Sequence, residues 1–323
     1  MPEPVRIPLD RLCRTAAAGP VYGEALDLAT PVDRERLFIA EELTPLFYTA
    51  AFRELSPAQA LRYNQISALA AGELIGLFED FAMAALRAVR SAAGPALPDD
   101  LREGLGWFLE EEARHAEVWL ELNRLCEPAW YGEAGRRIVQ PPRGLLAVMR
   151  WIASHPRALP VVFWMMLLQE ERSLAISRRS LAVADRLEPR WAAVYRLHLR
   201  DEIRHVHLDW HLLDHFYRDR SRPVRRLTAG LLRRITATFF LAPRRMAVRV
   251  VDLLIEEHPE LAPLRPRCLR ELAALGNDPA YRRMMYAREE LPVSAHLLDR
   301  FPELASFRDF LLGSPPARAE AAA

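Results

Sequence analysis

The sequence contains no lysine, so its 44 strongly basic residues are all arginines. This absence excludes Schiff-base and other lysine-dependent catalysis. The arginines are balanced by 43 acidic residues, which leaves a formal net charge of +1. Such a balance gives no reason to expect a nucleic acid or an anionic membrane surface as a partner.

Cysteine is scarce as well. The three cysteines, Cys13, Cys126 and Cys268, are odd in number, far apart and without a CxxC pair. We therefore expect neither a disulfide framework nor a thiolate zinc site, and a reducing cytoplasm is the expected location. The first residues also lack the apolar core of a signal peptide.

Long apolar runs are missing too. The longest, from Leu159 to Leu168, is about half of the roughly 20 residues that a membrane span needs. We interpret it as part of a buried helix.

Helical periodicity dominates the rest of the chain, with prolines near the starts of the periodic stretches. We expect helices over residues 33–52, 57–93, 98–126, 143–153, 156–186, 189–221, 223–257, 266–275, 279–289 and 293–302. Alternation typical of a strand is lacking, so the fold class is all-α. The expected organisation is an N-terminal extension over 1–32, one domain over 33–312 and a disordered tail over 313–323.

Two of the long helices carry the same motif, an acid followed by Glu-x-Arg-His. It occurs as Glu111-Glu112-Ala113-Arg114-His115 and again as Asp201-Glu202-Ile203-Arg204-His205. Residues three apart share one helix face, so the second Glu and the His of each motif point the same way. His198 lies four residues before Glu202 and so extends the second set by about one turn on that face. Two such helices predict a pseudo-symmetric four-helix core.

A Glu-x-x-His from each of two helices, with one Glu from each of two others, is the pattern of diiron and dimanganese carboxylate bundles. The helix over 57–93 offers Glu73 or Glu79, and the helix over 156–186 offers Glu170 or Glu171. These glutamates lie where an apolar face is expected, and burying an unpaired carboxylate costs at least several kcal/mol. Two divalent cations would balance four carboxylates. The sequence therefore predicts a ferritin-like bundle with a dinuclear metal centre and extra C-terminal helices.

Four further charged residues are expected around this centre. Glu111 and Asp201 would accept hydrogen bonds from the outer ring nitrogens of ligand histidines, and Arg114 and Arg204 would neutralise nearby carboxylates. A separate row of His207, His211 and His215 starts about 200° around the helix from His205. We interpret that row as a surface or a subunit contact.

The stretch His198-Leu199-Arg200-Asp201-Glu202-Ile203-Arg204-His205 resembles the histidine-rich helix of the bacterial p-aminobenzoate N-oxygenases. These are non-haem diiron enzymes that convert arylamines to nitroarenes, and in them a third histidine joins the usual diiron ligands. The resemblance covers residues 70–220 approximately. Its spacings favour Glu79 over Glu73 and Glu171 over Glu170. The implied ligands are Glu79, Glu112, His115, Glu171, His198, Glu202 and His205.

The resemblance implies two iron ions that activate O₂ with electrons from an external donor, since the chain has no GxGxxG motif for a nucleotide cofactor. The expected reaction is N-oxygenation of a small-molecule amine in secondary-metabolite biosynthesis, by a homodimer. The chain departs from the family at Ala71-Gly72-Glu73-Leu74, where small and apolar groups favour a bulkier or less polar substrate. The alternatives are a diiron oxygenase acting on carbon and a ferritin-like iron storage protein. The helices after residue 223 and the third histidine argue against storage.

Overall fold

A computed structural model describes residues 3–17, 30–93, 97–132, 138–241 and 244–313. Within these ranges every regular element is a helix, and the only strand-like contact is an isolated bridge between Leu37 and Leu187. The tail expected over 313–323 lies outside the described residues apart from Gly313, as do residues 1–2 and 18–29 of the expected N-terminal extension.

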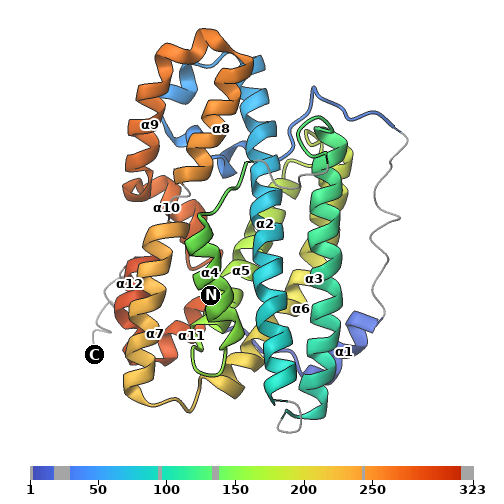
Figure 1. Cartoon of the computed structure of the whole chain (residues 1–323), viewed down its shortest axis with the longest axis vertical. Helices are drawn as coiled ribbons and strands as arrows, with labels where there is room; N and C mark the ends of the chain where they lie inside the picture. Colours follow the sequence, from blue (N-terminus) through green and yellow to red (C-terminus); the bar gives the residue numbers. More distant parts are fainter. Residues whose placement is uncertain (1–2, 18–29, 94–96, 133–137, 242–243, 314–323) are drawn as a thin grey trace, which may run out of the picture.

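Four long helices form the centre of the molecule: α2 (Pro57–Ala93), α3 (Asp99–Cys126), α5 (Val161–Leu181) and α6 (Pro189–Phe216). α2 pairs closely with α3, and α5 pairs closely with α6 (Figure 1). Pro57 and Pro189 open their helices, where a missing N–H costs nothing. The Glu188 carboxylate caps α6 by accepting from the backbone N–H groups of Arg190 and Trp191 at 2.9 and 3.3 Å. The expected all-α bundle is confirmed.

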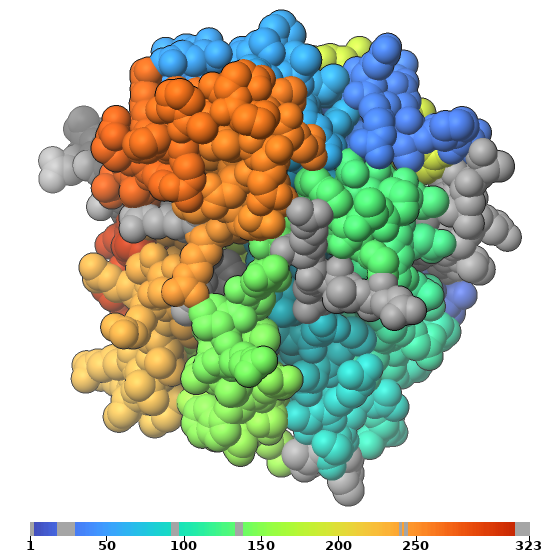
Figure 2. Space-filling model, turned by 45° about the horizontal axis from the view of Figure 1, so that its top comes forward, coloured from blue at the N-terminus to red at the C-terminus, as the bar shows by residue number. Residues whose placement is uncertain are grey.

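The remaining helices cover this bundle. They are α1 (Leu9–Ala17), α4 (Arg143–Ser154), α7 (Arg222–Ile235), α8 (Arg244–Glu257), α9 (Arg265–Ala274), α10 (Pro279–Tyr286), α11 (Pro292–Arg300) and α12 (Ala305–Leu312). α4 and α8 both pack against α2, and α9 packs against α8. Figure 2 shows α8 and α9 over one end of the molecule, with α4 on the surface below them. The additional C-terminal helices are thus confirmed.

The prediction of a helix over residues 33–52 is wrong. This segment forms three short 3₁₀ turns, Glu41–Leu43, Pro45–Tyr48 and Ala51–Glu54. The hydroxyls of Thr44 and Thr49 donate to the backbone carbonyls of Glu41 and Leu46 at 2.7 and 2.6 Å. Such local side-chain bonds compete with a continuous helix.

Other expected helices are shorter or divided. α5 starts at Val161 rather than at 156, since Pro160 disfavours helical geometry in the residue before it. α6 ends at Phe216, whose carbonyl accepts from Arg220 Nε at 2.8 Å. The helix expected over 223–257 is divided into α7, a π-turn over Thr236–Phe240, and α8. The sequence holds Pro243 at this division, and proline does not continue a helix.

Two short helices were not expected, α12 and α1. α1 buries Leu12, Cys13 and Ala16 against α3 and α6. Just before it, Ile7 donates its N–H to His207 Nδ1 at 3.3 Å and accepts from His211 Nε2 at 2.8 Å. This part of the histidine row on α6 therefore holds the N-terminal segment of the same chain.

The interior of the bundle has two apolar regions. On α3, Leu105 and Phe108 belong to one and Trp119 and Leu122 to the other. The segment from Glu111 to His115 lies between them, and both of these residues are buried. α6 has the same three parts in the reverse order along the chain, with Trp191 and Tyr195 in the second region and Leu208 and Trp210 in the first. A buried polar layer therefore crosses the bundle between two apolar cores.

A second buried carboxylate site joins α2 to the segment after α3. Glu73 accepts from the Tyr131 hydroxyl at 2.6 Å and from the backbone N–H groups of Ile138 and Val139 at 3.0 and 2.7 Å. It is 3% exposed. The carboxylate thus holds Tyr131, Ile138 and Val139 against α2.

We expect Glu73→Ala to destabilise the protein by about 3–5 kcal/mol, since two backbone donors and a hydroxyl lose a buried acceptor. The free energy of unfolding is measured by urea titration of metal-free protein. The exposed Glu110 of α3 provides the control, Glu110→Ala. Equal stability of the two variants would contradict the proposed role of Glu73.

Candidate metal centre

The polar layer holds seven carboxylate and imidazole groups from all four central helices. They are Glu79 on α2, Glu112 and His115 on α3, Glu170 on α5, and His198, Glu202 and His205 on α6. All are buried, with exposed fractions of 0 to 6%. Their atoms form three overlapping groups, and within each group the potential ligand atoms lie within 4.8 Å of one another.

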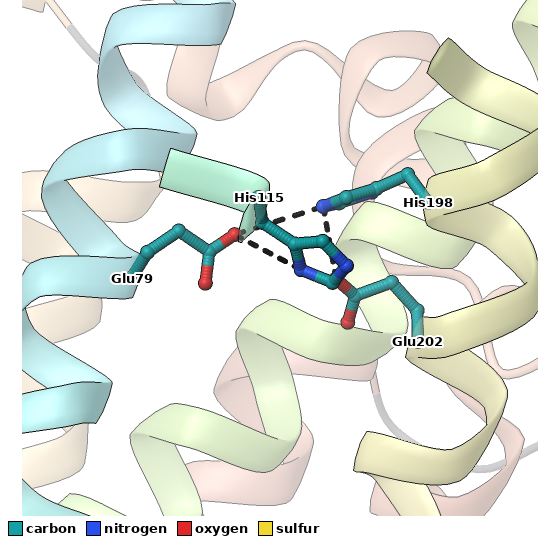
Figure 3. Close-up of side chains that lie close together, drawn as sticks. All are labelled: Glu79, His115, His198 and Glu202. Carbon is teal, nitrogen blue, oxygen red and sulfur yellow. Dashed lines mark ion pairs between the residues drawn. The ribbon is translucent and has the colours of Figure 1, made fainter. Parts of the chain in front are cut away.

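The first group joins Glu79, His115, His198 and Glu202, whose side chains point toward one another from three helices (Figure 3). His198 Nε2 lies 2.9 Å from Glu202 Oε1 and 3.6 Å from Glu79 Oε1. His115 Nδ1 lies 3.3 Å from the same Glu202 oxygen. Two imidazoles and two carboxylates therefore surround one position.

The other two groups lie around His205. Its Nδ1 is 3.1 Å from Glu112 Oε1 and 3.5 Å from Glu202 Oε2, and Glu170 joins it together with Glu202. Glu202 thus presents one oxygen to His198 and the other to His205. A carboxylate with one oxygen in each of two groups could contact two neighbouring metal ions, as in the carboxylate bundles that hold two metals.

Each histidine also has a partner on its outer nitrogen. His205 Nε2 lies 2.9 Å from Glu111 Oε2, and His115 Nε2 lies 3.5 Å from Asp201 Oδ2. The two contacts are reciprocal: an acid on α3 contacts a histidine on α6, and an acid on α6 contacts a histidine on α3. Arg204 joins the pair by donating to both Glu111 and Asp201. Such outer partners fix the tautomer and orientation of a ligand histidine.

The third histidine has a different outer partner. His198 Nδ1 lies 3.1 Å from the hydroxyl of Ser173 on α5. The sequence offered no signal for Ser173, because a serine in an apolar helix is usually packed or bonded to its own backbone. Arg114 differs from Arg204, since it makes no ion pair with any described carboxylate and its buried Nε has no hydrogen bond. The expected neutralising role of Arg114 is not supported.

The pKa values of these buried side chains indicate that the layer lacks positive charge. Burial and the charge of Glu112 raise the pKa of Glu170 to about 7. Burial and the charge of Glu170 raise the pKa of Glu202 well above its usual range. Burial lowers the pKa of His205, but the neighbouring carboxylates of Glu112 and Glu202 have the larger combined effect. The pKa of His205 therefore lies well above its usual value. Without cations, the layer therefore retains protons.

The ligand atoms also fit a metal chemically. Both oxygens of Glu112, both oxygens of Glu202, His198 Nε2 and His205 Nδ1 are buried and make no hydrogen bond within the described structure. Buried polar atoms are almost always paired. Mixed carboxylate and imidazole ligands suit iron or manganese better than softer metals. These residues accordingly fit a pair of divalent cations.

The structure places Glu171 away from this layer. Its carboxylate accepts from the backbone N–H groups of Val293 and Ser294, both at 2.7 Å, at the start of α11. Glu170, one residue earlier, points into the layer instead. The preference for Glu171 from spacing thus disagrees with the geometry, because the free N–H groups of a helix start attract a buried carboxylate.

Asp209 was missed by the sequence reasoning. It lies on α6 one turn beyond His205, is 0% exposed, and neither of its oxygens has a hydrogen-bond partner among the described residues. Burial and the charge of Glu170 raise its pKa well above the usual range. In the sequence Asp209 follows Leu208 after the His205-Val206-His207 run and resembles an ordinary charged helix residue, so periodicity alone does not single it out.

A cavity opens onto one edge of the layer, with an empty volume of about 890 Å³ that includes space open to solvent. Its walls include Ala71, Leu74 and Phe78 of α2 and Ile176 of α5, with Met246 of α8. Glu79 and Glu170 line the same cavity. A mainly apolar ligand can therefore reach the buried carboxylates.

Comparison with known families agrees with this site. A family model described as P-aminobenzoate N-oxygenase AurF matches residues 10–261. The chain belongs to the p-aminobenzoate N-oxygenase family. This assigns it to a family of ferritin-like diiron oxygenases and confirms the resemblance found in the α6 motif. The match to the N-oxygenase family contains all seven clustered residues.

No curated protein matches the chain. None of the described helices combines the length and the apolar character that crossing a membrane requires.

The two neighbouring glutamates of α5 provide a direct test of the ligand assignment. We expect Glu170→Ala to reduce the iron content from about two per chain to about one or fewer. We expect Glu171→Ala to keep the iron but to lower stability by about 2–4 kcal/mol, since two buried N–H groups lose their acceptor. Elemental analysis and thermal unfolding measure the two effects. The reverse pattern would restore Glu171 as the ligand.

Proposed function

We propose that the protein is a diiron oxygenase that transfers oxygen to the nitrogen of an amine, in the biosynthesis of a secondary metabolite. The observation that supports this most is the buried set of ligand atoms on a chain of the N-oxygenase family. The ligands we propose are Glu79, Glu112, His115, Glu170, His198, Glu202 and His205. When bound, the two irons supply the electrons that activate O₂.

The stoichiometry of N-oxygenation shows which electrons and protons the reaction needs in addition to O₂ and the amine. An amine, O₂, two electrons and two protons give a hydroxylamine and water, so one oxygen atom goes to nitrogen and the other to water. The electrons come from an external reductant, since the chain shows no nucleotide-binding motif. Further oxidation of the hydroxylamine leads to the nitro group.

The protein's own residues do the remaining work. Glu111, Asp201 and Ser173 hold the three histidines in orientation. Phe108 stacks on His205 with ring centroids 4.1 Å apart, and Trp119 lies edge-on to His198 at 5.3 Å. These rings shield His205 and His198 from water, while the cavity leaves Glu79 and Glu170 accessible to substrate.

Oxidation of carbon instead of nitrogen is the second candidate. The observation in its favour is the apolar wall formed by Ala71, Leu74 and Phe78, which accepts a hydrocarbon portion as readily as an aromatic ring. An iron storage role is less well supported, because a storage protein needs no organic ligand cavity beside its metal ligands. We propose a cytoplasmic homodimer in either case.

The first experiment is elemental analysis followed by rapid mixing of the reduced protein with O₂. We expect about two irons per chain and an absorbance transient that decays faster when an arylamine such as 4-aminobenzoate or aniline is present. The hydroxylamine product is identified by mass spectrometry. A transient unaffected by any amine would shift the proposal to a carbon substrate, and absence of iron after anaerobic reconstitution would remove it.

The third histidine has a separate test. We expect His198→Ala to keep most of the iron, because six ligands remain, and to lower turnover at least ~10-fold through the altered environment of one iron. Iron content and product formation are measured on the same preparation. His215→Ala, on the exposed face of α6, is the control. Unchanged turnover in His198→Ala would refute a specific role for this residue.

A further inference from the structure

The charges of the chain balance overall but not along its length. Residues 141–169 contain three arginines and no acidic residue, and residues 222–251 contain eight arginines and no acidic residue. The first stretch includes α4, and the second includes α7 and the first two turns of α8. Figures 1 and 2 both show α4 beside α7 at the surface. We call the exposed residues of α4 (Arg143–Ser154) and α7 (Arg222–Ile235) the basic face.

Four exposed arginines of the basic face form no ion pair within the described part of the chain. They are Arg143 and Arg150 on α4 and Arg226 and Arg234 on α7. Glu303 reaches two other arginines of α7, Arg222 and Arg225, but only at 3.6 and 3.7 Å. The face therefore retains a net positive charge, which attracts an anionic partner and repels a second copy of the same face.

The basic face also exposes apolar side chains. Val148, Trp151 and Leu227 are 53%, 57% and 57% exposed, and they are three of the six large apolar side chains that the described structure exposes. Exposed apolar groups rimmed by polar residues mark interaction sites, and tryptophan and arginine are enriched among the residues that dominate binding energy. The face thus has the composition of a protein-binding surface.

The size of the basic face favours a transient complex. α4 has 12 residues and α7 has 14, which corresponds to about 18 and 21 Å of helix. Two adjacent helices of this length, each roughly 10 Å in diameter, present an area of about 400 Å². A stable protein–protein interface buries about 800 Å² on each partner, whereas electron-transfer partners meet over smaller areas.

We propose that the basic face binds a small acidic electron-transfer protein, and that this protein is the external reductant of the metal centre. The inference rests on the proposed function, because that reaction needs two electrons for each oxygen atom transferred to nitrogen. The chain shows no nucleotide-binding motif with which to take these electrons from a nicotinamide itself. An acidic partner complements the four unpaired arginines, and Trp151 supplies an apolar contact among them.

The basic face is close to the centre that receives the electrons. α4 packs against α2, which carries Glu79, so one helix of roughly 10 Å diameter separates α4 from the metal layer. Each encounter transfers one electron, so that the redox centre of the partner is oxidised and one iron goes from the ferric to the ferrous state. Two encounters therefore restore the diferrous pair that reacts with O₂.

The probe for this site is a ferredoxin with a 2Fe–2S cluster, a small acidic electron carrier. Its affinity for the iron-reconstituted protein is measured by isothermal titration calorimetry at low ionic strength, with both proteins oxidised. Anaerobic stopped-flow absorbance gives the second-order rate constant for reduction of the irons by reduced ferredoxin. We expect the double variant Arg150→Glu with Arg226→Glu to weaken binding and to slow reduction, each by at least about 10-fold. Both differences should disappear near 1 M salt, where the Debye length is about 3 Å.

Matched controls separate docking from general effects of charge. Arg124→Glu reverses an exposed arginine on α3 and should leave both values close to those of the wild type. Trp151→Ala should weaken binding without changing its dependence on salt, since it removes contact area and no charge. Reduced methyl viologen is a small cation that needs no docking face, and it should reduce the double variant as fast as the wild type.

Three results would overturn the inference. The first is an equal affinity and reduction rate in the wild type and the double variant, or an equal loss in Arg124→Glu. The second is a wild-type protein that neither binds ferredoxin nor accepts its electrons. The third comes from vesicles of phosphatidylglycerol and phosphatidylcholine: if the double variant loses only vesicle binding, the face contacts a membrane and not a redox partner.

The inference and the proposed function fail in different ways. Reduction by ferredoxin through the basic face without oxygenation of any amine would support the docking role and refute N-oxygenation. Oxygenation of amines by ferredoxin-reduced protein, at rates that the substitutions do not change, would refute the docking role and leave N-oxygenation in place. If the double variant does not fold, as judged by circular dichroism, Arg150→Gln with Arg226→Gln provides the same comparison with a smaller change in charge.

Discussion

The structure depends on the cost of placing four carboxylates in one buried layer of a helical bundle. Glu79, Glu112, Glu170 and Glu202 are each at most 6% exposed, and burial of isolated ionised groups is prohibitive. The pKa of Glu170, raised to about 7, and the raised pKa of Glu202 show that protons compensate when cations do not. Metal binding at this layer must therefore release protons, and the fold tolerates the layer because two apolar cores enclose it.

The histidines of the layer are oriented by side chains that lie outside it. Glu111 on α3 and Asp201 on α6 each support a histidine of the opposite helix, and Arg204 contacts both acids. The two copies of the repeated motif are thereby joined across the bundle rather than within each helix. Displacement of either helix would disturb both histidines, so α3 and α6 are fixed in register at the site.

Helical periodicity in the sequence predicted most of this arrangement. It failed where the position of a side chain depends on a partner far away in the sequence. The spacing of Glu112 with His115 and of Glu202 with His205 is local, and the structure brings these four side chains together. Glu170 and Glu171 both lie on a helix buried on nearly all sides, so their hydrophobic surroundings do not separate them. The choice depends on the N–H groups of α11, more than 100 residues later in the chain. Pro243, by contrast, was visible in the sequence, yet the division of the 223–257 helix was missed.

The clustered carboxylates and the neighbouring cavity follow separate constraints on the same helices. Ligand positions on α2 and α5 tolerate little change, because each carboxylate must reach a shared centre. The neighbouring cavity residues Ala71, Leu74 and Arg172 contact no ligand atom that any described interaction records, so their identity is free to follow the substrate. The two sets of residues meet at Glu79 and Glu170, which belong to the clustered groups and also line the cavity, so these two positions are under both constraints.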